Sequence, residues 1–178
     1  MKWIKSTTKI LLIAFSIACL TVGCKSTDQP DKQKKKGKEA TIMRFHLEAN
    51  LDGTARTGSI TVCRSSPIVI NIDLVPVLNE GDVDNSEVLN SDDSFSLKIQ
   101  FNDRGKRILE MVSTANKGKH LAIYSQFGDA RWLAAPLITQ NITNGVLIFT
   151  PDCSLDEARR IVRGLNNVAE AVKKQNKF

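Results

Sequence analysis

The strongest constraint on this chain is an alternation of apolar and polar residues that begins near residue 42. Such alternation is typical of strands with one buried face, because successive side chains of a strand point to opposite sides of the sheet. Turn pairs such as Asp52-Gly53 and Asn144-Gly145 follow or precede the alternating runs. The pattern predicts strands in segments 43–49, 60–62, 68–72, 95–101, 121–124, 131–134 and 146–149.

Two segments follow the helical period instead. The first spans 102–118 and begins at the cap residue Asn102. The second begins with a capping box, Ser154 and Glu157, and carries an apolar stripe as far as Val172. Several strands with only two long helices predict an α+β fold, in which one antiparallel or mixed sheet carries both helices on one face.

The positive charge of the chain lies outside this patterned region. The 178 residues have a formal net charge of +6, and the excess comes from segments 1–23 and 24–39. Residues 40–178 carry equal numbers of basic and acidic side chains. A nucleic-acid-binding domain needs its positive charge on the folded surface, so this distribution argues against nucleic acid as a partner.

The first 23 residues have the organisation of a secretory signal. Lys2, Lys5 and Lys9 precede an apolar run at 10–20, and small residues follow it. The run is shorter than the ~20 apolar residues that span a bilayer. An uncleaved anchor or a buried helix is the alternative interpretation.

The end of this segment resembles the lipobox of bacterial lipoproteins, with Gly23 before the cut and Cys24 after it. The resemblance implies that the Cys24 thiol is lipidated and that acyl chains hold the protein on a membrane. Cys19 is a weaker competitor for the same role. Residues 24–41 then form a Lys-rich linker that is too polar to fold, and the folded domain is predicted over 42–173 with a tail at 174–178. Lys25 follows the cysteine in place of an inner-membrane retention aspartate, which favours the outer membrane.

The remaining cysteines, Cys63 and Cys153, are candidates for a disulfide, which the oxidising compartment implied by a signal segment permits. No Cys/His cluster has metal-ligand spacing, and we expect neither a metal nor a cofactor. His46 and His120 are isolated, with His46 expected on the polar side of its strand. The acidic run at 82–93 is interpreted as a solvated loop. Because no nucleophile, base or phosphate-binding motif converges, we expect a protein that is not an enzyme.

The segment from Phe95 to Leu165 resembles the head subdomain of the first periplasmic domain of SecD, the accessory subunit of the bacterial protein-export translocase. The positions that carry the resemblance follow in order: Leu97-Lys-Ile-Gln-Phe101, Gly105, Thr114, Asn116, Gly118-Lys119, Leu121-Ala-Ile123, Ala135-Pro136, Ile138, Ile142, Gly145, Phe149-Thr150, Leu155, Glu157 and Ala158. Upstream, Pro76-Val-Leu78 and Gly81-Asp-Val83 resemble the segment before the first helix of that family.

This resemblance covers about half of the chain and implies the fold of that subdomain. The transmembrane helices of SecD and their proton-relay carboxylates have no counterpart here, so we expect no ion-driven motor. The turn before Arg131 also departs from the family, because it reads Gln126-Phe-Gly-Asp129 in place of an Asp-Gly pair.

Phe127, Arg131 and Trp132 cluster on one predicted hairpin, and aromatic residues with arginine are favoured at protein interfaces. The alternative is that Trp132 is a core residue of its strand. The sequence thus predicts a lipid-anchored domain facing the periplasm that binds protein or extended polypeptide, in export or envelope assembly. The competing hypothesis is a structural envelope lipoprotein that constantly contacts the cell wall or a membrane complex.

Overall fold

The computed structural model describes residues 39–175. The predicted signal segment 1–23, Cys24, the linker up to residue 38 and residues 176–178 lie outside the described part of the chain. The described elements, in order, are β1 (Ile42–Leu47), β2 (Thr57–Val62), β3 (Ile68–Asp73), β4 (Leu78–Asn79), η1 (Glu80–Asp82), β5 (Val83–Asn90), β6 (Phe95–Phe101), α2 (Asp103–Ala115), β7 (Leu121–Phe127), β8 (Asp129–Ala134), β9 (Val146–Phe149) and α3 (Leu155–Gln175).

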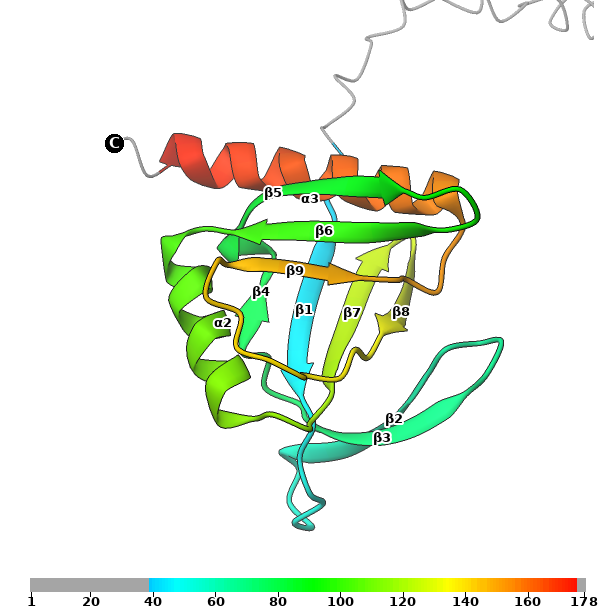
Figure 1. Cartoon of the computed structure of the whole chain (residues 1–178), viewed down its shortest axis with the longest axis vertical. Helices are drawn as coiled ribbons and strands as arrows, with labels where there is room; N and C mark the ends of the chain where they lie inside the picture. Colours follow the sequence, from blue (N-terminus) through cyan, green and yellow to red (C-terminus); the bar gives the residue numbers. More distant parts are fainter. Residues whose placement is uncertain (1–38, 176–178) are drawn as a thin grey trace, which may run out of the picture. The chain divides into compact units, whose positions relative to one another are not determined.

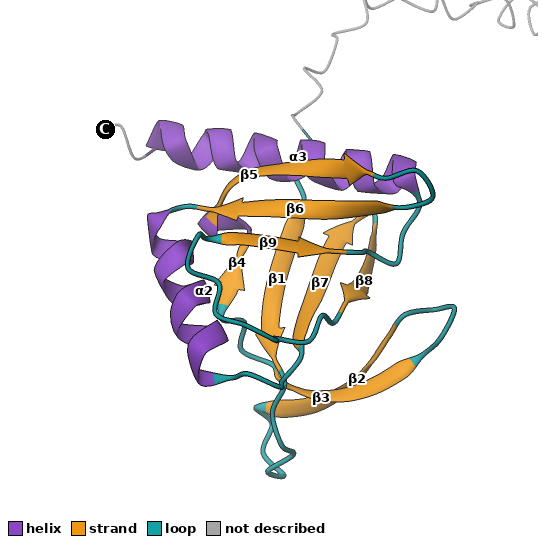
Figure 2. Cartoon of the chain, viewed as in Figure 1, coloured by secondary structure: helices purple, strands orange, loops and turns teal. Residues whose placement is uncertain are grey.

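The predicted α+β class is confirmed, with antiparallel strands throughout the described residues and two long helices (Figure 2). The strands are divided among three sheets, however, where the sequence suggested one. One sheet has the order β4-β1-β7-β8, a second β5-β6-β9, and a third is the β2-β3 hairpin. Alternation reveals which residues of a strand are buried, but it does not identify the sheet that the strand joins.

The two larger sheets face each other across the main core, and the strands of one run across those of the other (Figure 1). Met43 and Phe45 of β1 and Leu97 and Ile99 of β6 are all fully buried there. α2 borders this core at one side, and α3 lies beside β5 (Figure 1). Each helix contributes its apolar face, through Leu109 and Val112 of α2 and Ala158, Ile161 and Leu165 of α3.

Both helices begin at the residues that the sequence indicates. The side chain of Asn102 accepts a hydrogen bond from the backbone N–H of Gly105 at 2.9 Å. Ser154 Oγ accepts one from the backbone N–H of Glu157 at 3.2 Å. These side chains satisfy N–H groups that have no partner inside the helix, which is why each helix starts there.

α3 approaches the beginning of β1 closely at Gly164. A Cβ atom at this position would lie 2.1 Å from the Thr41 side-chain oxygen and 2.9 Å from the Thr41 backbone nitrogen. Only glycine permits this contact, which explains a residue that otherwise weakens a helix.

The acidic run at 82–93 is a solvated loop only at Asp92 and Asp93, which lie in the exposed turn between β5 and β6. Asp82 is buried, caps η1 through the backbone N–H of Asn79 at 3.0 Å, and forms a salt bridge with Arg104 at 2.5 Å. Residues 83–90 form β5, which pairs with β6 and packs on α3. The polar appearance of this strand was misleading because one face of it is exposed.

The β2-β3 hairpin covers part of the outer face of the four-stranded sheet. Its buried residues Val62, Ile70 and Ile72 form a second apolar cluster with Ala122 of β7. His46 lies beneath this hairpin, not on an exposed polar face as the sequence suggested. Its side chain is buried and its Nδ1 lies 2.9 Å from the backbone oxygen of Asp73.

Candidate functional site

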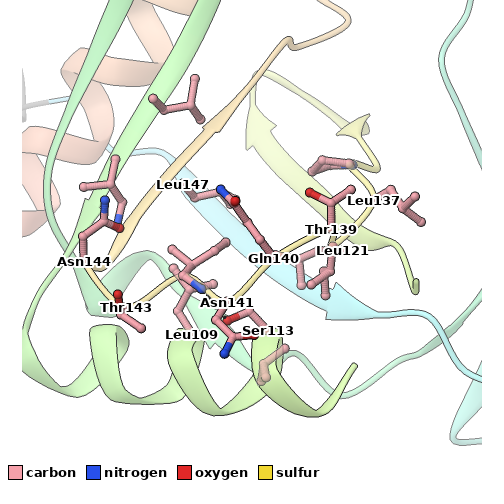
Figure 3. A pocket seen from close by; sticks show the side chains of 16 residues that line it. Leu109, Ser113, Leu121, Leu137, Thr139, Gln140, Asn141, Thr143, Asn144 and Leu147 are labelled. Carbon is pink, nitrogen blue, oxygen red and sulfur yellow. Dashed lines mark hydrogen bonds between the residues drawn. The ribbon is translucent and has the colours of Figure 1, made fainter. Parts of the chain in front are cut away.

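A groove of ≈ 390 Å³ lies beside β9, which is an edge strand of the β5-β6-β9 sheet. We call it the β9 groove; its walls come from β9, from the C-terminal part of α2, from the start of β7 and from segment 136–144. Sixteen residues line it (Figure 3). Its buried floor is Leu109, Val112, Leu121, Ile138 and Leu147, and its exposed rim includes Leu137, Thr139, Gln140, Asn141, Thr143, Asn144 and Ile148.

The free edge of β9 exposes main-chain groups to this groove. The backbone N–H of Phe101 donates to the oxygen of Gly145 at 2.9 Å, and β9 then pairs antiparallel with β6. In an antiparallel pair, hydrogen-bonded residues alternate with residues whose N–H and C=O point away from the partner. Val146 and Ile148 are of the second kind. The Val146 N–H is satisfied by the side chain of Asn144 at 3.0 Å, whereas Ile148 directs its main chain away from β6.

The polar rim is held in place by local hydrogen bonds. The backbone N–H of Ile142 donates to Ser113 Oγ of α2 at 2.9 Å. Gly145 has a φ of +71°, a conformation that favours glycine, and a Cβ there would lie 2.9 Å from the Lys106 Cβ. These contacts hold segment 136–145 against α2.

Every residue that lines the β9 groove is uncharged, and none is aromatic. Leu109, Leu121 and Leu147 lie among the side chains of the groove, together with the amides of Gln140, Asn141 and Asn144 (Figure 3). An apolar floor with neutral donors and acceptors at the rim suits a neutral, partly apolar ligand that also offers hydrogen bonds.

A second hollow, of ≈ 450 Å³, lies between β8 and the end of the β2-β3 hairpin. This β8 hollow contains two of the predicted interface residues, Arg131 and Trp132, together with Cys63 and Arg64. Both interface residues are engaged inside the protein. Trp132 makes edge contacts with the rings of His46 and Tyr124, with centroids 5.2 and 5.3 Å apart.

Arg131 connects β8 to the start of α3. Its Nη1 donates to the backbone oxygen of Asp152 at 2.6 Å, and its Nη2 pairs with the carboxylate of Glu157. Phe127, the third predicted interface residue, packs on the main core, and the guanidinium of Arg160 lies 4.6 Å above its ring. Arg131 and Trp132 thus share the β8 hollow, whereas Phe127 is not among the residues that line it.

Cys63 and Cys153 are both free, partly buried thiols, so the predicted disulfide is not present in this structure. Cys63 packs against the hairpin cluster, and Cys153 packs against the main core. Burial raises the pKa of the Cys153 thiol to about 11. Cys24 lies outside the described residues.

Several titratable groups of the described residues have structural partners. Glu48 accepts hydrogen bonds from the His120 backbone N–H at 2.7 Å and contacts Nδ1 of the same residue at 2.7 Å, and these bonds lower the pKa of Glu48. Desolvation by burial lowers the pKa of His46. Within residues 39–175, no group of three or more His, Cys, Asp or Glu side chains is placed to hold a metal ion. No helix in that part of the chain has the length and apolarity needed to span a membrane.

The sequence matches no protein-family profile and no curated protein. The fold, by contrast, is similar to solved structures of SecDF. One is described as a membrane component that enhances protein export; it shares 19% sequence identity, with a TM-score of 0.53 over 73% of this chain and 64% of that chain. Another, SecDF in a super-membrane-facing form, shares 20% identity, with a TM-score of 0.54 over 73% of this chain and 19% of that chain.

The chain thus spans less than two thirds of the SecDF structures that it matches. At this level of identity the similarity establishes a fold of the kind found in SecDF. The fold implied by the resemblance of Phe95–Leu165 to SecD is confirmed.

Sequence reasoning did not find the β9 groove. The available signal was weak: segment 139–144 reads Thr-Gln-Asn-Ile-Thr-Asn, a run without a charged residue next to a short strand. A neutral loop has no distinctive signature until the fold shows that it borders an open strand edge.

Proposed function

We propose that this chain is a lipid-anchored, non-enzymatic domain of the bacterial envelope, facing the periplasm, that binds extended polypeptide during protein export or envelope assembly. The observation that carries the proposal is the β9 groove, where the exposed main chain of Ile148 lies beside an apolar floor. An extended peptide can add to such an edge as a further strand. Main-chain hydrogen bonds then provide affinity, and alternate side chains enter the groove.

The lining favours polypeptide over the other ligands that an envelope protein meets. A phosphate or carboxylate ligand is bound most strongly by cationic side chains, and the groove residues carry none. Aromatic side chains, whose flat faces would stack on sugar rings, are also missing from these sixteen residues. A peptide main chain, with its regular donors and acceptors, matches both the open edge and the amide rim.

The similarity to SecDF supports the choice of process. SecDF is described as a membrane component that enhances protein export, and this chain has a similar fold over 73% of its length. A polypeptide in transit is unfolded, and an unfolded chain offers the extended main chain that an open strand edge binds.

The membrane anchor is proposed at Cys24, on the sequence alone. Replacing Cys24 with serine should leave an unprocessed precursor and abolish labelling by a clickable fatty acid. The outer membrane is the proposed destination, and density fractionation of labelled membranes tests it. Normal fatty-acid labelling of the Cys24→Ser variant would move the anchor to another residue, such as Cys19.

Binding is tested with the full chain and a reduced, alkylated model polypeptide that cannot refold. The variant Ile148→Lys places a charge at the open edge, where the native side chain is 53% exposed. Affinity should fall about tenfold, or ~1.4 kcal/mol. Val69→Lys is the matched control, because Val69 is 69% exposed and lies on the outer face of the hairpin, away from the groove.

Equal affinity of the two variants would exclude the β9 groove as the binding site. If the native chain bound no unfolded polypeptide at all, the structural lipoprotein hypothesis would replace the proposal. Thermal melts of both variants show whether any loss of affinity reflects unfolding.

A further inference from the structure

We infer that Cys63 and Cys153 form a reversible disulfide on oxidation, which fastens the β2-β3 hairpin to the segment before α3. The inference is independent of the β9 groove. It rests on the contact that holds the two cysteine-bearing segments together and on the position of each thiol beside that contact.

The contact joins the residue after Cys63 to the residue before Cys153. The backbone N–H of Arg64 donates to Oδ2 of Asp152 at 2.9 Å, and Nε of Arg64 donates to the same oxygen at 3.1 Å. Nη2 of Arg64 reaches the backbone oxygen of Asp152 at 3.3 Å. We call these three hydrogen bonds between Arg64 and Asp152 the bracket. Cys63 directly precedes Arg64 and Cys153 directly follows Asp152, so each cysteine is next to a residue of the bracket.

Further contacts hold Asp152, and the backbone conformation of Cys63 directs the chain toward Arg64. The backbone N–H of Asp152 donates to the oxygen of Leu133 at 2.7 Å, and Arg131 donates to the oxygen of Asp152 at 2.6 Å. Cys63 has a φ of 66° and is the non-glycine residue with positive φ among those described. This left-handed conformation turns the chain sharply where β2 ends, directly before the bracket.

The two thiols have different surroundings, which assigns them different roles. Cys63 lines the β8 hollow, which opens to solvent, so an external disulfide can reach it. Cys153 is partly buried on the main core, and burial keeps its thiol protonated at neutral pH. A bridge requires Cα atoms within about 7 Å. The bracket limits how far the two segments that carry the cysteines separate.

The chemistry is an ordinary thiol–disulfide exchange with a small or protein disulfide, RSSR, as the oxidant. Cys63 loses its proton and attacks one sulfur, which gives a Cys63–S–S–R mixed disulfide and releases RSH. Cys153 then loses its proton and attacks the Cys63 sulfur, which releases the second RSH. Two thiols are oxidised by two electrons, and RSSR is reduced to two RSH.

The experiment uses oxidised glutathione on the full chain, with Cys19 and Cys24 replaced by serine so that two thiols remain. Intact-mass and peptide mapping should show loss of two hydrogens and a peptide joined through Cys63 and Cys153. The melting temperature should rise by about 5–10 °C, because the bridge closes a long loop of the unfolded chain, and should return to its starting value on reduction.

Three variants separate the bridge from other reactions. Cys153→Ser should stop at the glutathione adduct on Cys63, and Cys63→Ser should react slowly or not at all. Asp152→Ala keeps both thiols but removes the two bonds of the bracket that the Asp152 carboxylate accepts, so its mixed disulfide should persist several times longer. A native chain that retains bound glutathione on Cys63, or that remains fully reduced, would overturn the inference.

Discussion

The two hollows at the free edges of the larger sheets have opposite chemistry. The β8 hollow contains a tryptophan and two arginines, the residue types that are enriched in binding sites. The tryptophan already contacts other rings of the protein, and the arginines already form hydrogen bonds within it. The β9 groove contains only neutral residues of ordinary type, and its strand edge is open. The comparison teaches that residues of a type common in binding sites indicate a binding surface only when other residues of the same protein do not already engage them.

The largest expected effect is the loss of stability on removing Trp132. Trp132→Ala deletes ring contacts with His46 and Tyr124 and opens a cavity under the hairpin, which should cost about 2–3 kcal/mol in urea unfolding. Binding of unfolded polypeptide should be unchanged under conditions where the variant is folded. Trp132→Phe, which keeps a ring, is the control. A stable Trp132→Ala protein that no longer bound unfolded polypeptide would instead indicate that Trp132 belongs to the partner-binding surface.

A smaller loss is expected at Arg131, whose side chain is 18% exposed and which holds β8 against the start of α3. Arg131→Ala leaves Glu157 without this partner and removes one of the two side-chain donors to the oxygen of Asp152, at a cost of about 1–2 kcal/mol. Arg159→Ala is the matched control, because the Arg159–Asp156 pair is largely exposed and contributes less than about 0.5 kcal/mol. Equal stability of the two variants would show that the Arg131 contacts contribute nothing.

Acid should weaken the hairpin side of the molecule in particular. Burial lowers the pKa of His46, so the unfolded chain binds the proton more tightly than the folded one. Stability should therefore fall as the pH decreases below about 6.5, and the decline attributable to His46 should end below its folded pKa. Melting temperatures between pH 7.5 and 5.5 measure this effect, and His46→Gln should flatten the profile. The lowered pKa values of Asp73 and Asp152 place their contributions at more acidic pH.

The smallest effect on stability is expected in the β9 groove itself. Leu137 is 49% exposed at the rim, so Leu137→Ser should change the free energy of unfolding by less than about 0.5 kcal/mol. Its affinity for unfolded polypeptide should nevertheless decrease. If Leu137→Ser unfolded the domain, the rim would be structural and the contrast between the two hollows would disappear.

Local patterns predicted much of this fold. The alternation in 95–101 matches β6, and the caps at Asn102 and Ser154 mark the starts of both helices. β5 escaped prediction because its sequence, Val-Asp-Asn-Ser-Glu-Val-Leu-Asn, is polar on an exposed face. The predicted interface residues were located on or beside the right hairpin, but their partners, among them His46, Asp152 and Glu157, come from distant parts of the chain.

The sequence by itself determined the α+β class, the two amphipathic helices, the neutral charge of the domain and the separate, basic N-terminal region. These properties depend on residues that are close in the chain, where period and capping act directly. The tertiary structure alone decided how the strands divide among three sheets, which strand edges stay open and which side chains are already satisfied. Those outcomes depend on contacts between residues far apart in the sequence, and no local pattern records such contacts.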